Sequence, residues 1–275
     1  MAEIPSGGFV ALISDFGYGS FYVGVMKAAV YHAAPHARVV DITHDISPQA
    51  VEEGSFILST VFDYFSPGSI FLAVVDPGVG GKRENLVFDL GDRYVVAPDN
   101  GLVSDLVARY EVDTCMAINT DRLDLFRLRP ETGKTFLGRD VFAPAAGALA
   151  SGTPLQELGN PADAFATIDI PTVRLGKNRI EGCGRYIDRF GNVLTNITSA
   201  HLDKAFSGHP FGKIRAQIGN RVVEGVQQCY SERPQGTFMV VLNSWNLIEV
   251  SVNRGRAADV LSLSDPCDAH VILEC

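Results

Sequence analysis

The chain has 275 residues, of which 46% are hydrophobic and 20% charged, and its formal net charge is -9. This length and composition are typical of a globular protein with one large or two smaller domains and a sizeable core. The acidic balance, with no cluster of Lys and Arg, argues against a nucleic acid or an anionic membrane surface as a partner.

Two further patterns limit the class of protein. No apolar stretch has the roughly 18 residues that a membrane-spanning helix needs, and the first residues lack the regions of a signal peptide. We therefore expect a cytoplasmic protein. The five cysteines are scattered and form no Cys-x-x-Cys pair, which is typical of reduced thiols. The six histidines lack metal-binding spacing, so we expect no metal site.

In the first 150 residues, apolar runs rich in β-branched residues alternate with helical patterns. Strands are predicted at 9–14, 38–43, 70–75, 85–89, 94–97 and 115–118. Helices are predicted at 20–34, from Pro48 to about 62, at 102–110 and at 143–150. This alternation is typical of an α/β domain whose mostly parallel sheet carries helices on both faces.

After about residue 175 the pattern changes to short β-like runs separated by turn residues. These runs lie at 179–187, 193–197, 213–218, 237–242 and 247–252. They predict an all-β domain, either a small sandwich or a barrel. We place the boundary within 172–178, which gives an α/β domain at 1–174 and a β domain at 178–275.

Asp76 follows the strand predicted at 70–75, which is apolar throughout and thus typical of a strand buried on both faces. The following Pro77 and the glycines up to Gly81 end the strand and prevent a helix. Ligands of open α/β sheets bind at this edge, so Asp76 is a candidate site residue. Taken alone, an Asp-Pro-Gly sequence is more often the cap of a turn.

Other acids and amides lie on predicted turns. They are Asp15, Asp99, Asn100, Asp188 and Asn192, and Arg83 lies seven residues beyond Asp76. A carboxylate at a strand end can accept hydrogen bonds from the paired hydroxyls of a ribose. The segment 186–192 combines an acid, an aromatic ring and an amide, which suit an adenine ring and an ammonium group. As isolated motifs these residues, too, are more often turns and caps.

Taken together, these residues resemble the family of S-adenosylmethionine hydrolases (hydroxide adenosyltransferases), which is related to the fluorinase and the chlorinase. The matching segments occur in the family's order at 13–17, 40–44, 75–80, 97–101, 135–136, 138–140, 188 with 190–192, 243–244 and 253–255. The resemblance implies an amino-terminal α/β domain, a carboxyl-terminal β-barrel and a homotrimer. It also implies that S-adenosylmethionine binds between the first domain of one subunit and the second domain of its neighbour.

The resemblance further implies a set of substrate-binding residues. They are Asp15, Thr135, Phe136, Asp188, Phe190, Asn192, Ser244, Asn253 and Arg254. Asp15 would hold the ribose hydroxyls, while Phe190 and Asn192 would contact adenine. Asp188 and Ser244 would hold the ammonium and carboxylate groups of the methionine part. Asn253 and Arg254 belong to a matching segment near adenine.

Asp76 bears on the identity of the nucleophile. In the halogenases that the chain resembles, a tyrosine replaces this aspartate, so Asp76 indicates water or hydroxide as the nucleophile. The hydrolases orient that water with an Asp, an Arg and a His, and the first two are spaced as Asp76 and Arg83 are. At the third position this chain has Leu137, and Gln49 replaces an aromatic residue expected after Pro48.

We therefore expect hydrolysis of S-adenosylmethionine to adenosine and L-methionine, without a cofactor, catalysed by Asp76 and Arg83. Leu137 leaves an alternative open, because leucine neither holds a water nor transfers a proton. In that case the protein binds or senses S-adenosylmethionine or adenosine without turnover. A halide-dependent adenosyltransferase is the third hypothesis, although the carboxylate of Asp76 would repel an anion.

Overall fold

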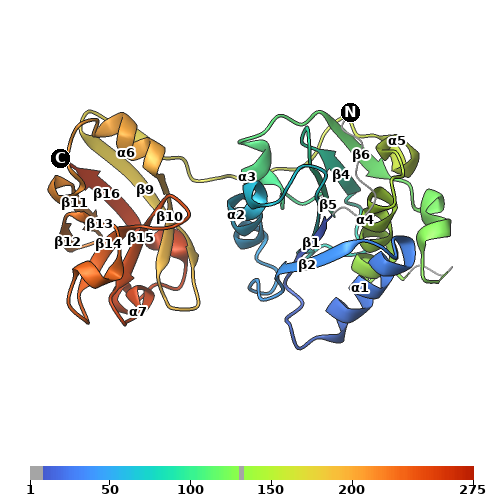
Figure 1. Ribbon diagram of the computed structural model, residues 1–275, viewed down its shortest axis with the longest axis horizontal. Helices are drawn as coiled ribbons and strands as arrows, with labels where there is room; N and C mark the ends of the chain where they lie inside the picture. Colours follow the sequence, from blue (N-terminus) through green and yellow to red (C-terminus); the bar gives the residue numbers. More distant parts are fainter. Residues whose placement is uncertain (1–8, 130–132) are drawn as a thin grey trace. The chain divides into compact units, whose positions relative to one another are not determined.

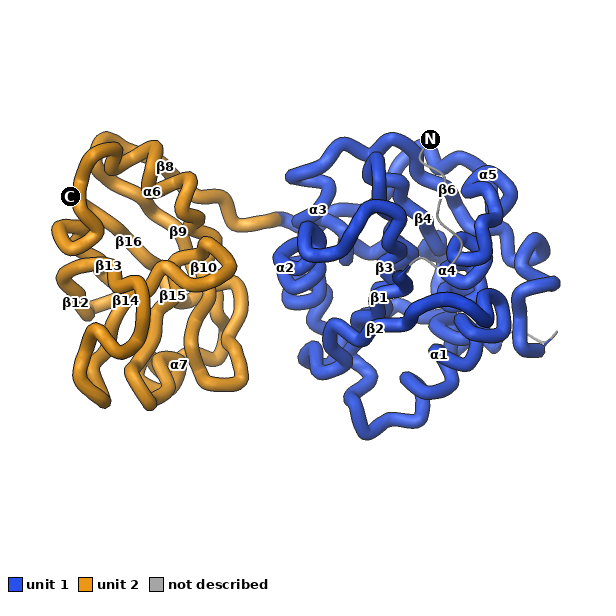
Figure 2. Tube along the Cα trace, viewed as in Figure 1, with its two compact units in different colours: residues 1–169 blue, residues 170–275 orange. Residues whose placement is uncertain are grey.

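A computed structural model describes residues 9–129 and 133–275. The chain forms two compact units, residues 1–169 (unit 1) and residues 170–275 (unit 2), which Figure 2 shows in blue and orange. Each unit has its own apolar core. Among the described residues, no helix combines the length and the apolar character that crossing a membrane requires.

Unit 1 is built on a seven-stranded sheet in the order β2-β1-β3-β5-β4-β6-β7 (Figure 1). The strands are β1 (Phe9–Ser14), β2 (Arg38–Thr43), β3 (Ile70–Val74), β4 (Asn85–Asp89), β5 (Tyr94–Pro98), β6 (Thr114–Ile118) and β7 (Gly159–Pro161). The neighbours β2, β1, β3 and β5 are parallel, and the remaining strands extend the sheet in antiparallel pairs. Every residue of β3 is buried, which confirms the buried strand that the sequence predicts.

Helices cover both faces of the unit 1 sheet, as predicted. On one face, α1 (Phe21–Ala33) and α4 (Ala143–Ala150) pack together against the side chains of Val10 and Leu12 in β1. On the other, α2 (Val51–Val61) and α3 (Ser104–Val107) pack against Ala11 and Ile13. The alternation of side chains along β1 therefore divides the apolar core between two layers of helices. A short helix, α5 (Leu155–Leu158), precedes β7.

Two helices of unit 1 differ from the predicted ones. Helix α2 begins at Val51 rather than at Pro48, because Gln49 has a φ of 68°, in the left-handed region, and turns the chain before the helix. Helix α3 is restricted to Ser104–Val107 within the predicted span of 102–110. The side-chain oxygen Oδ1 of Asn100 accepts a hydrogen bond from Leu102 N–H, which forms a turn before α3.

Unit 2 is a nine-stranded, barrel-like sheet in the order β12-β11-β16-β9-β10-β15-β14-β13, with β8 also pairing with β9. Its strands are β8 (Arg174–Gly176), β9 (Arg179–Ile187), β10 (Val193–Thr198), β11 (Arg215–Ile218), β12 (Arg221–Glu224), β13 (Val226–Gln227), β14 (Phe238–Leu242), β15 (Leu247–Val252) and β16 (His270–Glu274). The sheet curls so that β12 contacts β14 around a shared apolar core. Of the two predicted forms, sandwich or barrel, the barrel is confirmed.

Unit 2 also contains two short helices that the sequence pattern did not predict, α6 (Ser199–Ala205) and α7 (Ala257–Leu261). Helix α6 begins with a capping box, in which Thr198 accepts a hydrogen bond from His201 N–H and the ring of His201 accepts one from Thr198 N–H. With seven and five residues, α6 and α7 are too short to show a clear helical spacing of apolar residues. The pattern of the surrounding sequence therefore predicted only strands.

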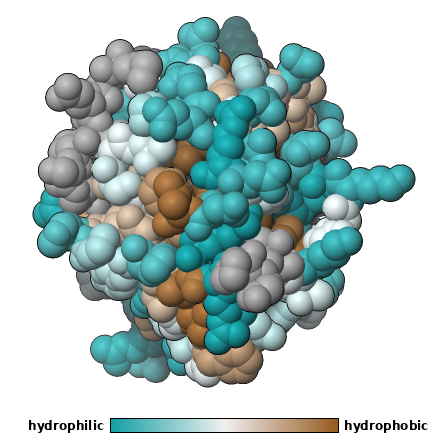
Figure 3. Space-filling view, turned by 90° about the vertical axis from the view of Figure 1, so that its right-hand side faces the viewer, coloured by the Kyte–Doolittle hydropathy of each residue, from teal (hydrophilic) through white to brown (hydrophobic). Residues whose placement is uncertain are grey.

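The surface of unit 1 gives little sign of a large apolar contact area on the face shown in Figure 3. Hydrophilic side chains predominate there, and apolar side chains come to the surface in small, separate groups. Scattered apolar groups of this size are normal on a protein surface.

Candidate functional site

In unit 1, the candidate residues lie where β2, β1, β3 and β5 end, an edge that we call the rim. Because these strands are parallel, their carboxyl ends meet at one edge of the sheet. Backbone hydrogen bonds tie the loops together: Gly17 N–H donates to His44 O at 2.6 Å. The amide of Asn100 donates to Val75 O at 2.9 Å, which fixes the end of β3 against the loop after β5.

Asp76 and Arg83 form a two-point ion pair at the rim. Arg83 Nε donates to Asp76 Oδ1 at 2.7 Å, and Nη2 donates to Oδ2. The remaining nitrogen of Arg83, Nη1, donates to Glu84 O and to Asn85 Oδ1. The side chains of Arg83 and Asp76 are 11% and 6% exposed, and the guanidinium lies 5.5 Å from the ring centroid of Phe142. Both partners are thus held in one orientation.

Asp15, the predicted ribose ligand, lies in the loop after β1. Its Oδ2 accepts a hydrogen bond from Gln49 N–H at 2.8 Å. The left-handed backbone of Gln49 directs this N–H at the carboxylate, so the residue that replaces an expected aromatic one acts here through its main chain. Asp15 Oδ1 has no partner among the hydrogen bonds of the described residues and remains available to a ligand hydroxyl.

The segment before α4 brings Thr135, Phe136 and Leu137 to the same rim. The ring of Phe136 lies 5.7 Å from that of Phe16, which follows Asp15. A Cβ placed on Gly80 would lie only 2.5 Å from Lys134 O, so the glycine loop after Asp76 packs directly on this segment. Leu137 is half-buried against the core at the start of the wide helical turn Gly138–Phe142. The structure therefore gathers all five unit 1 candidates at the rim.

A chain of polar side chains near the rim, buried at Ser14 and His44, was not predicted from the sequence. Phe16 N–H donates to Ser14 Oγ, whose hydroxyl donates to His44 Nδ1 at 2.7 Å. His44 Nε2–H then donates to Asp41 Oδ1 at 3.1 Å, and Lys27 Nζ donates to Asp41 Oδ2 at 2.6 Å. Although this order resembles a Ser-His-Asp triad, Ser14 is completely buried and cannot reach a substrate. The chain instead holds the loops after β1 and β2 together.

From the sequence, Asp41 and His44 were placed only within the matching segment 40–44. Burial lowers the pKa of His44, while the hydrogen bond and charge of Asp41 oppose that effect. For Asp41, burial acts to raise the pKa, but hydrogen bonds from Lys27 and His44 outweigh it and the pKa is lowered. Neutral His44 with an ionised Asp41 is thus the form that the folded protein favours.

We expect the stability of the protein to fall on acidification through His44. Because its pKa is lower in the folded state, the unfolded chain takes up a proton first as the pH falls below about 6.5, which favours unfolding by at most about 1.4 kcal/mol per pH unit. Urea unfolding at about pH 7.5 and about pH 5.5 should show a smaller loss in His44→Gln than in the unchanged protein. The exposed His36, changed to Gln, serves as the control.

An equal loss of stability in His44→Gln and in the unchanged protein would contradict this role of His44. Asp41 acts in the same direction as His44, since its pKa is also lowered, but it titrates at lower pH and does not affect this comparison.

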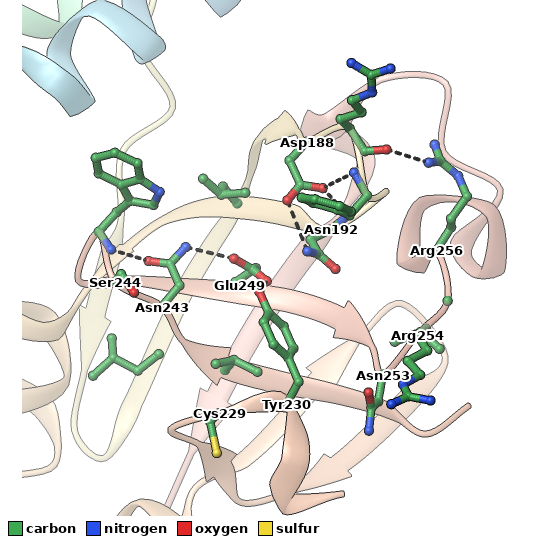
Figure 4. Close-up of a pocket in the computed structure, with 18 of the residues that line it drawn as sticks. Asp188, Asn192, Cys229, Tyr230, Asn243, Ser244, Glu249, Asn253, Arg254 and Arg256 are labelled. Atoms are coloured by element: carbon green, nitrogen blue, oxygen red, sulfur yellow. Dashed lines mark hydrogen bonds between the residues drawn. The ribbon is translucent and has the colours of Figure 1, made fainter. Parts of the chain in front are cut away.

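In unit 2, the remaining candidates line a single cavity of about 1000 Å³, the unit 2 pocket. The predicted residues on its wall are Asp188, Phe190, Asn192, Ser244, Asn253 and Arg254. They come from the β9–β10 turn, the β14–β15 turn and the segment after β15 (Figure 4). The fold thus brings together residues up to 66 positions apart, between Asp188 and Arg254.

Asp188 organises the turn between β9 and β10. Its Oδ1 accepts hydrogen bonds from Phe190 N–H at 2.9 Å and Asn192 N–H at 2.8 Å, and its Oδ2 accepts one from Asn192 Nδ2 at 3.1 Å. Gly191 has a φ of 83° and packs against Arg256, where a side chain would collide. The ring of Phe190 is 75% exposed, whereas Asn192 is buried. This turn presents an aromatic face beside a fixed amide, as recognition of a purine ring requires.

A second carboxylate of the unit 2 pocket, Glu249, was not among the predicted residues. Its Oε1 accepts hydrogen bonds from Tyr230 Oη at 2.7 Å and Ser251 Oγ at 2.6 Å. Its Oε2 accepts one from Asn243 Nδ2 at 3.0 Å (Figure 4). Burial, followed by the hydrogen bond to Glu249, raises the pKa of Tyr230. From the sequence, Glu249 is one polar residue in an alternating strand, and nothing marks it as buried.

No metal site emerges from this geometry. Within residues 9–129 and 133–275, no three or more His, Cys, Asp or Glu side chains are arranged so that they could hold a metal ion. The candidate residues instead offer carboxylates, amides, hydroxyls and aromatic rings, which suit an organic ligand.

Comparison with known proteins supports a single family over most of the chain. Residues 10–159 match the family domain described as SAM hydroxide adenosyltransferase N-terminal domain, and residues 182–266 match the corresponding C-terminal domain. An (R)-S-adenosyl-L-methionine hydrolase of Thermus thermophilus is 35% identical, covering 93% of this chain and 96% of its own. One of Salinispora arenicola is 32% identical, covering 96% of both chains.

The fold is also similar to a solved structure. The crystal structure of an uncharacterized conserved protein from Thermotoga maritima matches with a TM-score of 0.89 and 30% sequence identity. The match covers 97% of this chain and 100% of that one, so both units have counterparts there.

Proposed function

The chain belongs to the S-adenosylmethionine hydroxide adenosyltransferase family, and from this premise we propose that it hydrolyses S-adenosyl-L-methionine to adenosine and L-methionine. Relatives that carry the name of this hydrolase match more than nine-tenths of the chain. The observation within the structure that best supports the proposal is the two-point pair of Asp76 and Arg83 at the rim.

In the proposed reaction, a water oxygen attacks the ribose C5′ in line with the C5′–S bond. The new C5′–O bond forms as the C5′–S bond breaks. The electron pair of the C5′–S bond stays on sulfur and converts the sulfonium into the neutral thioether of methionine. The water loses one proton, which Asp76 would accept, while the pair with Arg83 holds the carboxylate in position. Holding the water and C5′ in line supplies much of the rate enhancement.

The proposal requires no cofactor and no metal, because the sulfonium is already a good leaving group. Its positive charge disappears as the bond breaks, so a partly apolar site favours the transition state over the charged substrate. Asp15 would hold the ribose hydroxyls through its open oxygen, and Phe190 and Asn192 would hold adenine. Asp188 and Ser244 would hold the amino-acid end of the substrate.

We also propose that the protein acts as a homotrimer in the cytoplasm, with S-adenosylmethionine bound between subunits. The proposed ligands are divided between unit 1 and unit 2, which agrees with a site to which two domains contribute. Scattered cysteines without metal-binding or disulfide spacing suit a reducing compartment. Sedimentation equilibrium showing three times the chain mass of 29.6 kDa would support the trimer, and a stable monomer would contradict it.

One specific observation favours a second candidate function, binding without turnover. Leu137 packs an apolar side chain against the core, three residues after Lys134, whose carbonyl contacts Gly80 in the loop that follows Asp76. The family resemblance implies a histidine at this position. If that histidine is essential, the unit 2 pocket still binds S-adenosylmethionine, but the reaction does not proceed. A halide as nucleophile is disfavoured, since the carboxylate of Asp76 repels anions.

Product analysis distinguishes these functions. The protein is incubated with S-adenosylmethionine, with and without chloride or fluoride, and the nucleosides are separated by chromatography. We expect adenosine and L-methionine in equal amounts, independent of halide. Calorimetric binding without adenosine would support the binding function instead, and a halogenated nucleoside would overturn the choice of water as nucleophile.

A further inference from the structure

Glu249 is a buried carboxylate on the side of the sheet that faces the unit 2 pocket. Along β15, the side chains of Ile248 and Val250 lie in the apolar core, so the side chain of Glu249 points to the opposite face. Directly paired residues of β9, β10, β15 and β14 form one row across that face. This row is Tyr186, Leu194, Glu249 and Val241, and all four line the pocket.

The negative charge of Glu249 has no cationic partner in the part of the chain that the structure describes. Only 4% of the residue is exposed, and its three hydrogen-bond donors, Tyr230, Asn243 and Ser251, are all neutral. Among the described residues, no Lys, Arg or His forms an ion pair with it. A buried carboxylate is normally paired with a cation, because leaving water is costly for an isolated charge.

Glu249 also keeps room for one more donor. Its Oε1 accepts two hydrogen bonds and its Oε2 accepts one, whereas each carboxylate oxygen can accept about two. The donor on Oε2 is fixed in orientation, since the amide oxygen of Asn243 accepts hydrogen bonds from Trp245 N–H and Leu247 N–H. Asn243 immediately precedes Ser244, so the open position of Glu249 lies beside the segment assigned to the amino-acid end of the substrate.

We propose that Glu249 recognises the ammonium group of the substrate's amino-acid arm, together with Asp188. This assignment rests on the proposed function and adds a specificity-determining residue to it. An alkylammonium supplies both things that the carboxylate lacks, a positive charge and a further hydrogen-bond donor. Asp188, whose three donors come from its own turn, is the second negative charge on the pocket wall.

The ammonium is a better partner for Glu249 than the sulfonium is. A carboxylate beside the sulfonium would stabilise the substrate more than the transition state, in which that charge disappears, and would slow the reaction. The ammonium keeps its charge in substrate, transition state and methionine product. Glu249 therefore contributes equally to all three, and its loss should raise KM with little change in kcat.

The test measures how strongly the protein distinguishes ligands with and without the amino group. S-adenosylhomocysteine and its analogue lacking the α-amino group are titrated calorimetrically into the unchanged full-length protein and into Glu249→Gln. Glutamine keeps the size and hydrogen bonding of the side chain and removes its charge. We expect the affinity ratio of the two ligands to fall by about 10- to 100-fold in the variant, with adenosine affinity unchanged.

Glu232→Gln is the matched control, because Glu232 is exposed near the pocket but is not on its wall. This variant also removes one negative charge, so an equal effect there would mean that general electrostatics, and not Glu249, sets the preference. An unchanged ratio in Glu249→Gln would overturn the assignment while leaving the proposed function intact. Absence of S-adenosylmethionine binding to the unchanged protein would overturn both.

The ligand series alone provides a second test if Glu249→Gln does not fold, as judged by thermal unfolding and adenosine binding. In the unchanged protein, removal of the amino group should weaken binding by about 10-fold or more. Equal affinity of the two ligands would overturn the role of Glu249, because its charge would then have no effect on recognition.

Discussion

Replacing Asp76 by Asn is expected to lower kcat for S-adenosylmethionine hydrolysis by about 10²- to 10⁴-fold, the usual contribution of a positioned proton acceptor. Asparagine has the shape of aspartate but can no longer accept the proton of the attacking water. Its amide nitrogen would also face the N–H groups of Arg83, so the two-point pair would be lost. Adenosine release in single-turnover experiments measures this effect independently of product release.

The structure offers a matched control for the Asp76 variant. Asp63 pairs with Arg109 in the same unit, but both of these side chains are about half exposed and lie on the α2–α3 side of the sheet. Asp63→Asn should therefore leave kcat unchanged. Substrate affinity of Asp76→Asn, measured by calorimetry, should stay close to that of the unchanged protein. Full activity in Asp76→Asn would contradict the proposal that this carboxylate accepts the proton of the attacking water.

Replacing Leu137 by His should raise kcat by about 10²-fold, the lower end of the range for general acid-base catalysis. Residue 137 lies three residues after Lys134, whose carbonyl contacts Gly80 in the loop that follows Asp76, and we expect an imidazole there to help orient the water and remove its proton. The substitution sacrifices apolar contacts of a half-buried leucine with the core, at about 1 to 2 kcal/mol of folding stability. The pH dependence of kcat should acquire a step near about pH 6.5.

Leu137→Gln distinguishes two roles that a histidine at this position can have, holding the water and accepting its proton. Glutamine can hold a water but does not titrate near neutral pH, so a gain limited to Leu137→His indicates proton transfer. Similar gains in both variants would assign a positioning role to this site. If the unchanged protein is active and neither variant gains activity, Asp76 and Arg83 suffice without a third group. If all three proteins are inactive, Leu137 is not the cause of the missing turnover.

The sequence predicted strand positions well where apolar runs are sharply bounded. Strands β1, β2, β4, β9 and β15 begin and end at the predicted residues. In each, a charged, glycine or proline-containing segment lies close to an end of the run, so local sequence and the final pairing agree. Helices were less accurate, because α2 starts only after the left-handed turn at Gln49, which no residue pattern announces.

The site was predictable where the motif itself forms the geometry. Asp76 and Arg83 are seven residues apart, and a single glycine loop brings them together. The pair of Ser14 and His44 depends instead on the parallel pairing of β1 with β2 over 30 residues of sequence. Glu249 was missed because alternation in β15 places it on an outer face, where a glutamate needs no explanation until Tyr230 and Asn243 are seen to cover it.

The close contact of Gly80 with Lys134 O limits how this protein can diverge. Only glycine fits at position 80, because its φ of 75° disfavours other residues and a Cβ there would collide with the carbonyl of Lys134. Gly78, two residues earlier, has open space around it. A descendant that acquires a side chain at position 80 must therefore reshape the segment around residue 134 in the same lineage. Since that segment continues into Leu137, a change at position 80 is expected to bring changes near Leu137 with it, while position 78 is free to vary.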